Sequence, residues 1–452
     1  MIRKYRIFGS SLTSIVIVDY LSKQINCEVE WILTNKNRYG GHFAGVEVFN
    51  SQLDIGMVAL EVDEPIKQKD SITTTSPPQG NQINSFLKLV NKWFMLQGVT
   101  IHQMTIETKH NDRNYPDIFI SNDTTLFYFN KHKLNLDENH LDKHYYSTHH
   151  PIRKNEDNFV KYLNLERYIR QVYGDSFFTE IVFQFVNKID IKLLEKVIVA
   201  CHRSLWIPLY YPETILASTR NINENTRLVR FFSCIKQDTI AELLKRIINS
   251  IRSSDRVKVI ENLGDFSRDT LIDFSKKNDG TWINVFAEDQ KLISKQTVSN
   301  TEYLGIFVIY IKTKTELTDR VIFDTDLSND FFRLTSRSVK DKLGFNYVSI
   351  ESTKDFKESL EANFDYSYFK DYAHSVLGVN IEIEEICVKS GKLNLMTKEY
   401  VLDIEKKSEE TSNFLQKYNV IDLSHNGLNN SMNEQILSAL WYIEKINDKE
   451  IG

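Results

Sequence analysis

The sequence predicts an α/β protein with two domains, one of which is built on a parallel sheet. Strand-like and helix-like apolar patterns alternate over the first sixty residues, and the same alternation returns at 239–260 and 419–446. Short apolar runs between polar turns fill 281–350, as in a mixed or antiparallel sheet. A length of 452 residues is enough for two or three domains.

The chain opens with the pattern of a strand, a tight turn and a helix. Residues 5–8 form a short apolar run that reaches Gly9, and residues 12–21 then carry apolar side chains at helical spacing. A second strand is expected at 29–33. The three elements form a βαβ unit, whose crossover is right-handed.

A glycine-containing turn follows the second predicted strand. It comprises residues 37–43 and includes the pair Gly40 and Gly41, which permits backbone conformations that other residues resist. Residues 53–56 close this first unit. The polar, proline-containing run at 71–80 predicts a boundary or a loop.

Helices and strands are predicted in turn along the rest of the chain. Helices are expected at 84–96, 158–173, 176–189, 239–251 and 431–446, and strands at 257–260, 304–311, 320–323, 347–350 and 419–423. We therefore assign residues 1–75, 201–275 and 401–452 to one discontinuous domain. Residues 76–200 form the helical part and residues 276–400 the sheet part of the other.

Composition excludes several classes of protein. Hydrophobic residues make up 41% and charged residues 26%, which excludes a disordered or collagen-like chain. The formal net charge of -5 argues against a general nucleic-acid binder. No apolar run is long enough for a membrane span or a signal peptide. The four cysteines form no CxxC motif, so we expect a cytoplasmic protein without disulfides.

The first turn has the register of a dinucleotide-binding turn, Gly9-Ser10-Ser11-Leu12-Thr13-Ser14. Such turns use three glycines, for the tight turn, for close approach to a diphosphate and for packing of helix on strand. Here only Gly9 is a glycine, and serines occupy the other two positions. Taken alone, this turn is better explained as an ordinary structural element.

Further motifs in the same order change that interpretation. They are Arg38-Tyr39-Gly40-Gly41-His42-Phe43, Tyr173 to Lys188, Leu209-Tyr210-Tyr211-Pro212, Asp330 to Leu334, and Asp422 to Glu434. With the Gly9 turn, they resemble the flavin amine oxidase superfamily, especially its protoporphyrinogen-oxidase-like and UDP-galactopyranose-mutase-like branches. The resemblance implies a Rossmann-like FAD/NAD(P)-binding domain and a second, α+β substrate domain.

The resemblance also implies the positions of the cofactor-binding residues. Those around the FAD diphosphate are Gly9, Ser10, Ser11, Leu12 and Thr13, those near the adenosine ribose are Thr34 and Asn35, those near the ribityl chain are Arg38, Gly40, Gly41 and His42, and those beside the flavin are Asp422, Met432 and Asn433. Ser11, Ser14 and Thr34 depart from the pattern. They leave open whether FAD binding is retained, altered or lost.

A small, anionic substrate is expected between the domains. The residues that we assign to it are Glu61, Arg203, Tyr210, Tyr211 and Arg333, with Arg337 nearby, because guanidinium groups match phosphate and carboxylate. Asp54 is expected to make structural hydrogen bonds.

No metal site and no thiol nucleophile are predicted. Five histidines cluster in a polar region (His132, His140, His144, His149 and His150), but without an HExxH motif a solvated loop is the better interpretation. Cys201 next to His202 lacks the spacing of a thiolate dyad and is assigned to the core.

Three functions remain open at this level. The first is an FAD-dependent oxidoreductase, in which hydride passes from a small polar substrate to flavin N5. The second is a non-redox mutase that acts on a nucleotide-linked sugar through reduced flavin. The third is a cofactor-free descendant of the fold that serves as a binding or scaffolding subunit.

Overall fold

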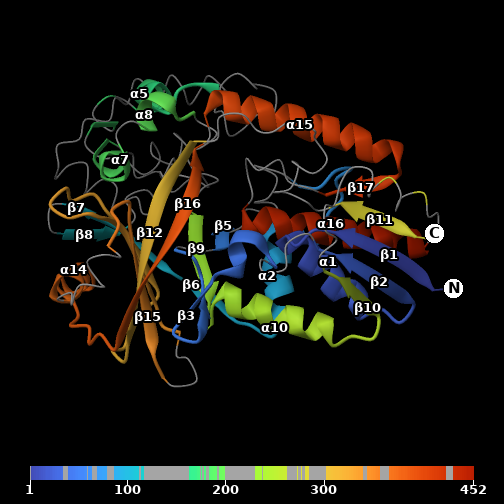
Figure 1. Ribbon diagram of the computed structural model, residues 1–452, viewed down its shortest axis with the longest axis horizontal. Coiled ribbons are helices and arrows are strands. Elements are labelled where there is room, and N and C mark those ends of the chain that lie inside the picture. The colour runs from blue at the N-terminus through green and yellow to red at the C-terminus, as the bar shows by residue number, and fades with distance from the viewer. Residues whose placement is uncertain are drawn as a thin grey trace.

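The molecule has two main sheets, which lie at opposite ends of Figure 1. The computed structural model describes residues 2–33, 39–56, 58, 60–63, 69–78, 86–110, 113–116, 162–173, 175, 178–179, 183–190, 193–198, 230–236, 238–261, 272, 276, 280–284, 302–339, 344–356, 366–395, 397–423 and 431–451.

The first sheet has five strands, all of them parallel. Their order is β10 (Val257–Ile260), β2 (Cys27–Ile32), β1 (Arg3–Phe8), β11 (Thr281–Asn284) and β17 (Val420–Asp422). The sheet thus gathers strands from both ends and the middle of the chain. β11 belongs to it, although residues 276–400 were assigned to the sheet of the second domain.

Helices cover both faces of this sheet, which explains why its strands are apolar on both sides. One core cluster joins the sheet to α1 (Leu12–Ser22), α2 (Leu87–Leu96), α10 (Ile240–Arg252) and α16 (Met432–Ile451). On the opposite face Phe8 and Ile32 pack with Phe414 and Leu415 of α15 (Lys398–Lys417), the long helix at the top of Figure 1. The α/β class expected from the sequence is confirmed.

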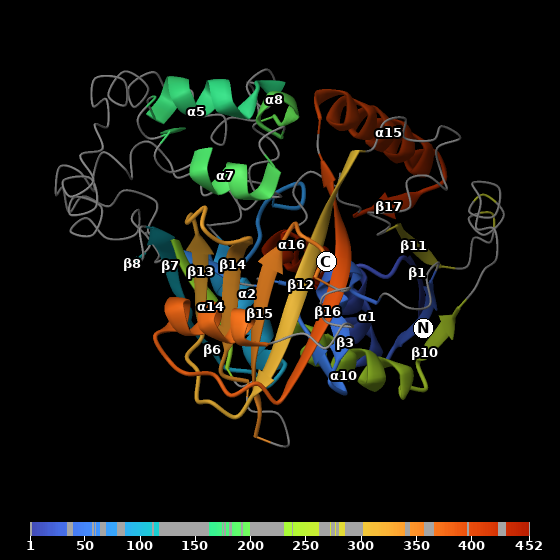
Figure 2. The ribbon, with the colours of Figure 1, turned by 60° about the vertical axis from the view of Figure 1, so that its left-hand side comes forward.

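The second sheet has seven strands and is mixed. Their order is β16 (Glu385–Leu395), β12 (Glu302–Thr313), β15 (Asn346–Ser352), β14 (Phe331–Arg337), β13 (Arg320–Asp324), β7 (Thr105–His110) and β8 (Arg113–Pro116). Only β13 and β7 pair in parallel. α14 (Ser367–Leu377) packs on one face through a core around Phe331 and Phe369, as Figure 2 shows.

Smaller elements connect the two sheets. β5 (Leu60–Asp63), β9 (Arg230–Ile235) and β6 (Ile101–Gln103) form a three-stranded sheet, and β3 (Val46–Val48) pairs with β4 (Ser51–Leu53). A short 3-10 helix, η1 (Gly41–Ala44), lies before β3.

The predicted helical region contains α5 (Leu165–Tyr173), α7 (Phe183–Asp190) and α8 (Leu193–Lys196), near the top of Figure 2. Among the described residues, no helix combines the length and the hydropathy that crossing a membrane requires.

Candidate functional site

The candidate site lies at the edge of the parallel sheet where its strands end. β1 ends at Phe8 and leads through Gly9 into α1, and β17 ends at Asp422, shortly before α16 begins at Met432. Ligands of open parallel sheets bind outside this edge, and the first turn of a helix presents backbone N–H groups there. The two helix starts make this edge the place to look for an anionic ligand.

Gly9 has the backbone conformation that a tight strand-to-helix turn requires. Its φ angle is 113°, a value that residues with a side chain rarely adopt. The Gly9 N–H donates to the carbonyl of Ile32 at 3.0 Å, and the indole N–H of Trp31 donates to the Gly9 carbonyl at 2.8 Å. These bonds hold the turn against the end of β2.

The two serines that replace glycines stabilise the start of α1. Ser11 is the N-cap with φ -65° and ψ 165°, an extended conformation open to any residue, and its hydroxyl accepts from the Ser14 N–H. The buried Ser14 hydroxyl in turn donates to the Ser11 carbonyl at 2.7 Å. Glycine is therefore not needed at position 11 for the backbone to form this turn.

The first N–H of α1 already has an acceptor within the chain. Leu12 N–H donates to Oε1 of Gln435, in the first turn of α16, at 3.1 Å, and the Thr13 hydroxyl donates to the Gln435 carbonyl at 3.1 Å. Gln435 is buried. Local sequence patterns give no sign of this contact, because Leu12 and Thr13 lie 423 and 422 positions away from Gln435. A diphosphate bound to the Leu12 N–H has to displace the Gln435 amide.

The double-glycine turn lies against the Gly9 turn. The Gly40 N–H donates to the Ser10 carbonyl at 2.5 Å, and Gly40 has φ 90°. A Cβ at this position would lie 2.9 Å from Cδ1 of Leu244 on α10. Gly40 therefore lets two turns far apart in sequence approach each other.

His42 follows within η1, and its ring contacts that of Phe43 at an interplanar angle of 44°, with 3.8 Å between the ring centroids. Its side chain keeps an exposed edge, yet the protein around the ring displaces enough water to lower the pKa of His42 to about 4. The imidazole is therefore neutral at pH 7. It offers a hydrogen bond but no positive charge.

The start of α16 is organised by a capping box. The Ser431 hydroxyl accepts from the Glu434 N–H at 3.2 Å, and the Glu434 carboxylate accepts from the Ser431 N–H at 3.2 Å. Met432 and Asn433 are both buried, and Asp422 is half-buried at the end of β17. The structure thus brings these three predicted residues to the edge that also carries Gly9.

Several predicted residues lie outside the part of the chain that the structure describes. They are Thr34, Asn35, Arg38, Arg203, Tyr210 and Tyr211, together with Cys201 and the five clustered histidines. Glu61 lies in β5, but its side chain is outside the described part. Their assignments stay predictions.

Arg333 is buried in β14 and pairs with a carboxylate. Its Nε and Nη2 donate to the two oxygens of Glu351, each at 2.6 Å, and the two side chains are 1% and 2% exposed. Gly56 lies directly beside this pair, since a Cβ there would be 2.8 Å from Oε1 of Glu351. Glu351 neutralises the charge that was expected to hold an anionic substrate.

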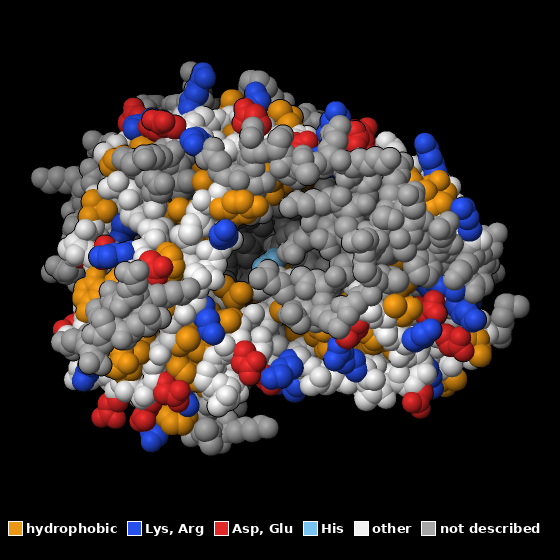
Figure 3. Space-filling view, in the orientation of Figure 1, with side chains coloured by type: hydrophobic (Ala, Val, Ile, Leu, Met, Phe, Trp, Pro, Cys, Tyr) orange, Lys and Arg blue, Asp and Glu red, His pale blue; other side chains and the backbone are white. Residues whose placement is uncertain are grey.

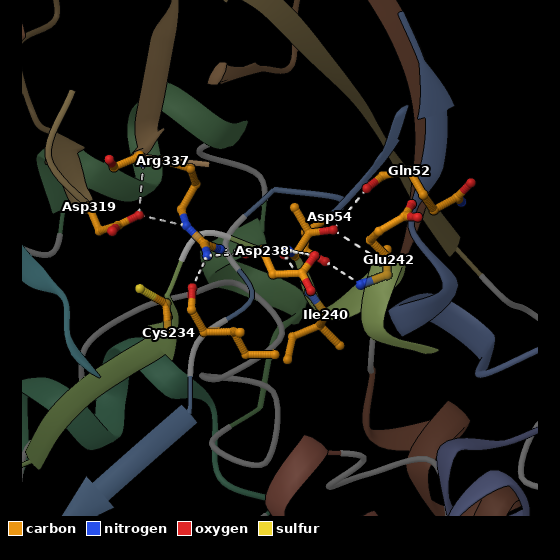
Figure 4. A network of polar contacts seen from close by, with 12 residues as sticks. Gln52, Asp54, Cys234, Asp238, Ile240, Glu242, Asp319 and Arg337 are labelled. Atoms are coloured by element: carbon orange, nitrogen blue, oxygen red, sulfur yellow. Dashed lines mark hydrogen bonds and ion pairs between the residues drawn. The ribbon is translucent and has the colours of Figure 1, made fainter. Parts of the chain in front are cut away.

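A second buried network surrounds Arg337 at the junction of the sheets (Figure 4). Its Nε donates to Oδ1 of Asp319 at 2.8 Å, and Nη2 donates to the carbonyls of Ile235 at 2.9 Å and Asp238 at 2.7 Å. Nη1 lies 3.5 Å from Oδ2 of Asp54. The guanidinium thus connects β14, β9 and the start of α10.

Asp54 makes the structural hydrogen bonds expected of it. Its carboxylate accepts from the N–H groups of Ile240 at 3.3 Å and Ala241 at 2.9 Å, in the first turn of α10. Burial raises the pKa of Asp54, and Arg337 opposes that shift. Asp54 therefore caps α10 and lies close to Arg337, which balances its charge.

A hollow opens near the middle of the face shown in Figure 3. Hydrophobic side chains, a basic side chain and a histidine lie at its rim, between the parts of the molecule that carry the two main sheets. The face between the domains is therefore not flat.

The fold as a whole is similar to that of solved proteins. The chain has the fold of UDP-galactopyranose mutase. The reduced form of that enzyme superposes with a TM-score of 0.58 at 11% identity, over 98% of this chain and 96% of the mutase chain. The fold that the resemblance implied is thereby confirmed.

A second solved structure covers the whole length as well. It is a protein from Exiguobacterium sp. 255-15, provisionally described as a protoporphyrinogen oxidase, with a TM-score of 0.51 at 10% identity over 99% of each chain. No family model matches the sequence, and no curated protein matches it either.

Proposed function

We propose that the chain binds FAD at the edge of the parallel sheet and acts as an oxidoreductase on a small polar substrate. The observation that carries this proposal is the convergence of two helix starts, those of α1 and α16, beside the Gly9 turn. Backbone N–H groups and the positive ends of two helices favour a ligand with negative charge. The shared fold with UDP-galactopyranose mutase supports the choice of ligand.

The residues present fit a dinucleotide, provided that its diphosphate displaces one side chain, that of Gln435. Gly9 and Gly40 give the backbone its close approach, and Ser10 and Ser11 carry hydroxyl groups beside α1. The Leu12 N–H is engaged by a side chain that a diphosphate has to replace, that of Gln435.

Each part of the site has a proposed role. Gly9 to Thr13 hold the diphosphate, Thr34 and Asn35 lie by the ribose, Arg38, Gly40, Gly41 and His42 approach the ribityl chain, and Asp422, Met432 and Asn433 flank the flavin. Bound FAD supplies the acceptor for hydride. Neutral His42 adds no positive charge there, and the buried side chains of Met432 and Asn433 exclude water.

For the substrate we propose Glu61, Arg203, Tyr210 and Tyr211 as contacts. Arg333 already pairs with Glu351 through its Nε and Nη2 atoms. We therefore assign it a structural role, in which the ion pair fixes the position of the side chains beside Gly56.

A ligand series tests the cofactor proposal. Fluorescence titrations with FAD, FMN and riboflavin, and competition by ADP, compare ligands that carry or lack the diphosphate and the adenosine. FAD is expected to bind tightest and to be displaced by ADP. Equal affinity for riboflavin would show that the helix starts do not contribute to binding.

A non-redox mutase is the second candidate, and likeness over the full length of UDP-galactopyranose mutase favours it. It predicts that UDP-galactopyranose is converted only after the flavin is reduced. Turnover of a substrate by oxidised protein, with uptake of oxygen, would instead support the oxidoreductase. If no flavin binds at all, the cofactor-free binding subunit is what remains.

A further inference from the structure

Three side chains with metal-binding atoms converge where the three-stranded sheet meets the seven-stranded sheet. His102 of β6 and Cys234 of β9 are direct partners across an antiparallel pair, and Asp319 immediately precedes β13. His102 Nε2 lies 2.7 Å from Oδ2 of Asp319 and 3.5 Å from Sγ of Cys234. The three donor atoms all lie within 4.8 Å of one another.

The three donor atoms face one another closely enough to share one ion. Both the carboxylate oxygen and the sulfur face the same nitrogen of His102, and without a metal the Asp319 carboxylate is the hydrogen-bond partner of both His102 and Cys234. An ion between the three atoms satisfies all of them at once. We propose that His102, Cys234 and Asp319 form a binding site for a divalent transition metal, and that Zn²⁺ is the ion that fits their donor set.

The distances agree with a tetrahedral zinc site. Zinc bonds of about 2.3 Å to sulfur and about 2.0 Å to nitrogen place those ligand atoms roughly 3.5 Å apart. The observed separation of Nε2 and Sγ is 3.5 Å. The separation of Nε2 and Oδ2, 2.7 Å, has to open by about 0.6 Å to reach tetrahedral spacing. A rotation of the carboxylate provides that movement.

The surroundings orient the carboxylate and balance the charge. Oδ1 of Asp319 accepts from Nε of Arg337 at 2.8 Å and from the N–H of Ser338 at 3.0 Å, which leaves Oδ2 directed at His102. A thiolate and a carboxylate neutralise a divalent ion, while Arg337 and Asp54 neutralise each other. The site is thus electroneutral with the metal bound and the thiol proton released to solvent.

Three protein ligands leave the fourth position of the ion to water, and the site is not fully enclosed by protein. The His102 side chain is 32% exposed, whereas that of Asp319 is 7% exposed. Such a site holds together β6, β9 and the start of β13, and its open position resembles that of a catalytic rather than a closed structural zinc site.

The same residues do not form a cysteine nucleophile. In a nucleophilic triad the two ring nitrogens of the histidine face the nucleophile and the acid separately, whereas here one nitrogen faces both. Burial raises the pKa of Cys234 to about 12, so its thiol is protonated and unreactive in the absence of a metal.

Cobalt titration of the full chain, stripped with EDTA, tests the proposal. We expect one Co²⁺ per chain, with the ultraviolet charge-transfer band of a cobalt thiolate and the visible bands of tetrahedral cobalt, and displacement by Zn²⁺. Cys234→Ser is expected to abolish the thiolate band, and His102→Gln to weaken binding by at least about 100-fold, more than the loss of an outer-shell partner. Cys387→Ser and Cys201→Ser serve as controls, which should keep both the thiolate band and the affinity for cobalt.

The outcomes that overturn the proposal are distinct. They are the absence of a thiolate band in the parent protein, or its persistence in Cys234→Ser. Cobalt bound only by the histidine-rich segment would give no thiolate band and would count against the site. If Cys234→Ser fails to fold by circular dichroism, His102→Gln decides alone, because its partly exposed side chain is the least disruptive to replace.

Discussion

Gln435→Ala removes the side chain that occupies the start of α1. The amide oxygen of Gln435 accepts from the Leu12 N–H at 3.1 Å, and both groups are buried. If a diphosphate binds to that N–H, the parent protein must break this bond first. The variant has no such bond to break, so its affinity for FAD should rise.

The size of the effect follows from the energy of one hydrogen bond. A neutral hydrogen bond contributes about 1 kcal/mol net, which corresponds to about a five-fold gain in affinity. In the variant without ligand, the N–H is buried without its acceptor, so the free energy of unfolding should fall by about 1–3 kcal/mol. Gln435→Glu should have the opposite effects: weaker FAD binding and no loss in the free energy of unfolding. A carboxylate at a helix start is favourable by about 0.3–1 kcal/mol and repels the diphosphate.

Flavin fluorescence titration at fixed ionic strength measures the affinities, and urea denaturation measures the stabilities. Gln416→Ala, which changes an exposed glutamine of α15, is the matched control and should alter neither. Unchanged or weaker FAD binding in Gln435→Ala, or equal binding in the alanine and glutamate variants, would refute this explanation of the helix start.

Three other predictions concern stability. Arg337→Met leaves two buried carboxylates without their cation and should lower the free energy of unfolding by about 3–5 kcal/mol in urea; a loss below about 1 kcal/mol would contradict the network. Gly45→Ala should lower the free energy of unfolding more than Gly98→Ala does. Both glycines have positive φ, but only at Gly45 would a Cβ lie 2.2 Å from the Leu53 carbonyl oxygen. Equal losses of stability in the two variants would show that the close contact relaxes. The folded-state pKa of His42, about 4, lies below its usual value, so stability should fall as pH falls from about 6.5 towards 4, and His42→Gln should flatten that slope in pH-dependent thermal unfolding.

Local patterns in the sequence were enough to predict the scaffold of the candidate site. The run that ends at Gly9 and the helical spacing after it predicted β1 and α1, and the apolar pattern after residue 419 predicted β17 and α16. Side chains in these elements alternate between two buried faces, and such periodicity depends only on neighbouring residues.

Contacts between distant segments could not be predicted in this way. Gln435 reaches Leu12 across 423 positions, and His102 meets Asp319 across 217. The ion pair between Arg333 and Glu351 on the adjacent strand also joins residues that the sequence does not place together. The highly charged helix α15 was not anticipated, because its buried stripe is narrow among many Lys and Glu residues.

The most direct test of the account is the absorbance spectrum of the purified protein, recorded before and after addition of FAD and removal of the excess by gel filtration. The account predicts the two flavin bands of the near-ultraviolet and blue regions, eluting with the protein at a ratio of one FAD per chain. Protein that elutes without these bands in both samples would contradict it, and would mean that the Gln435 contact keeps the edge of the parallel sheet closed to the cofactor.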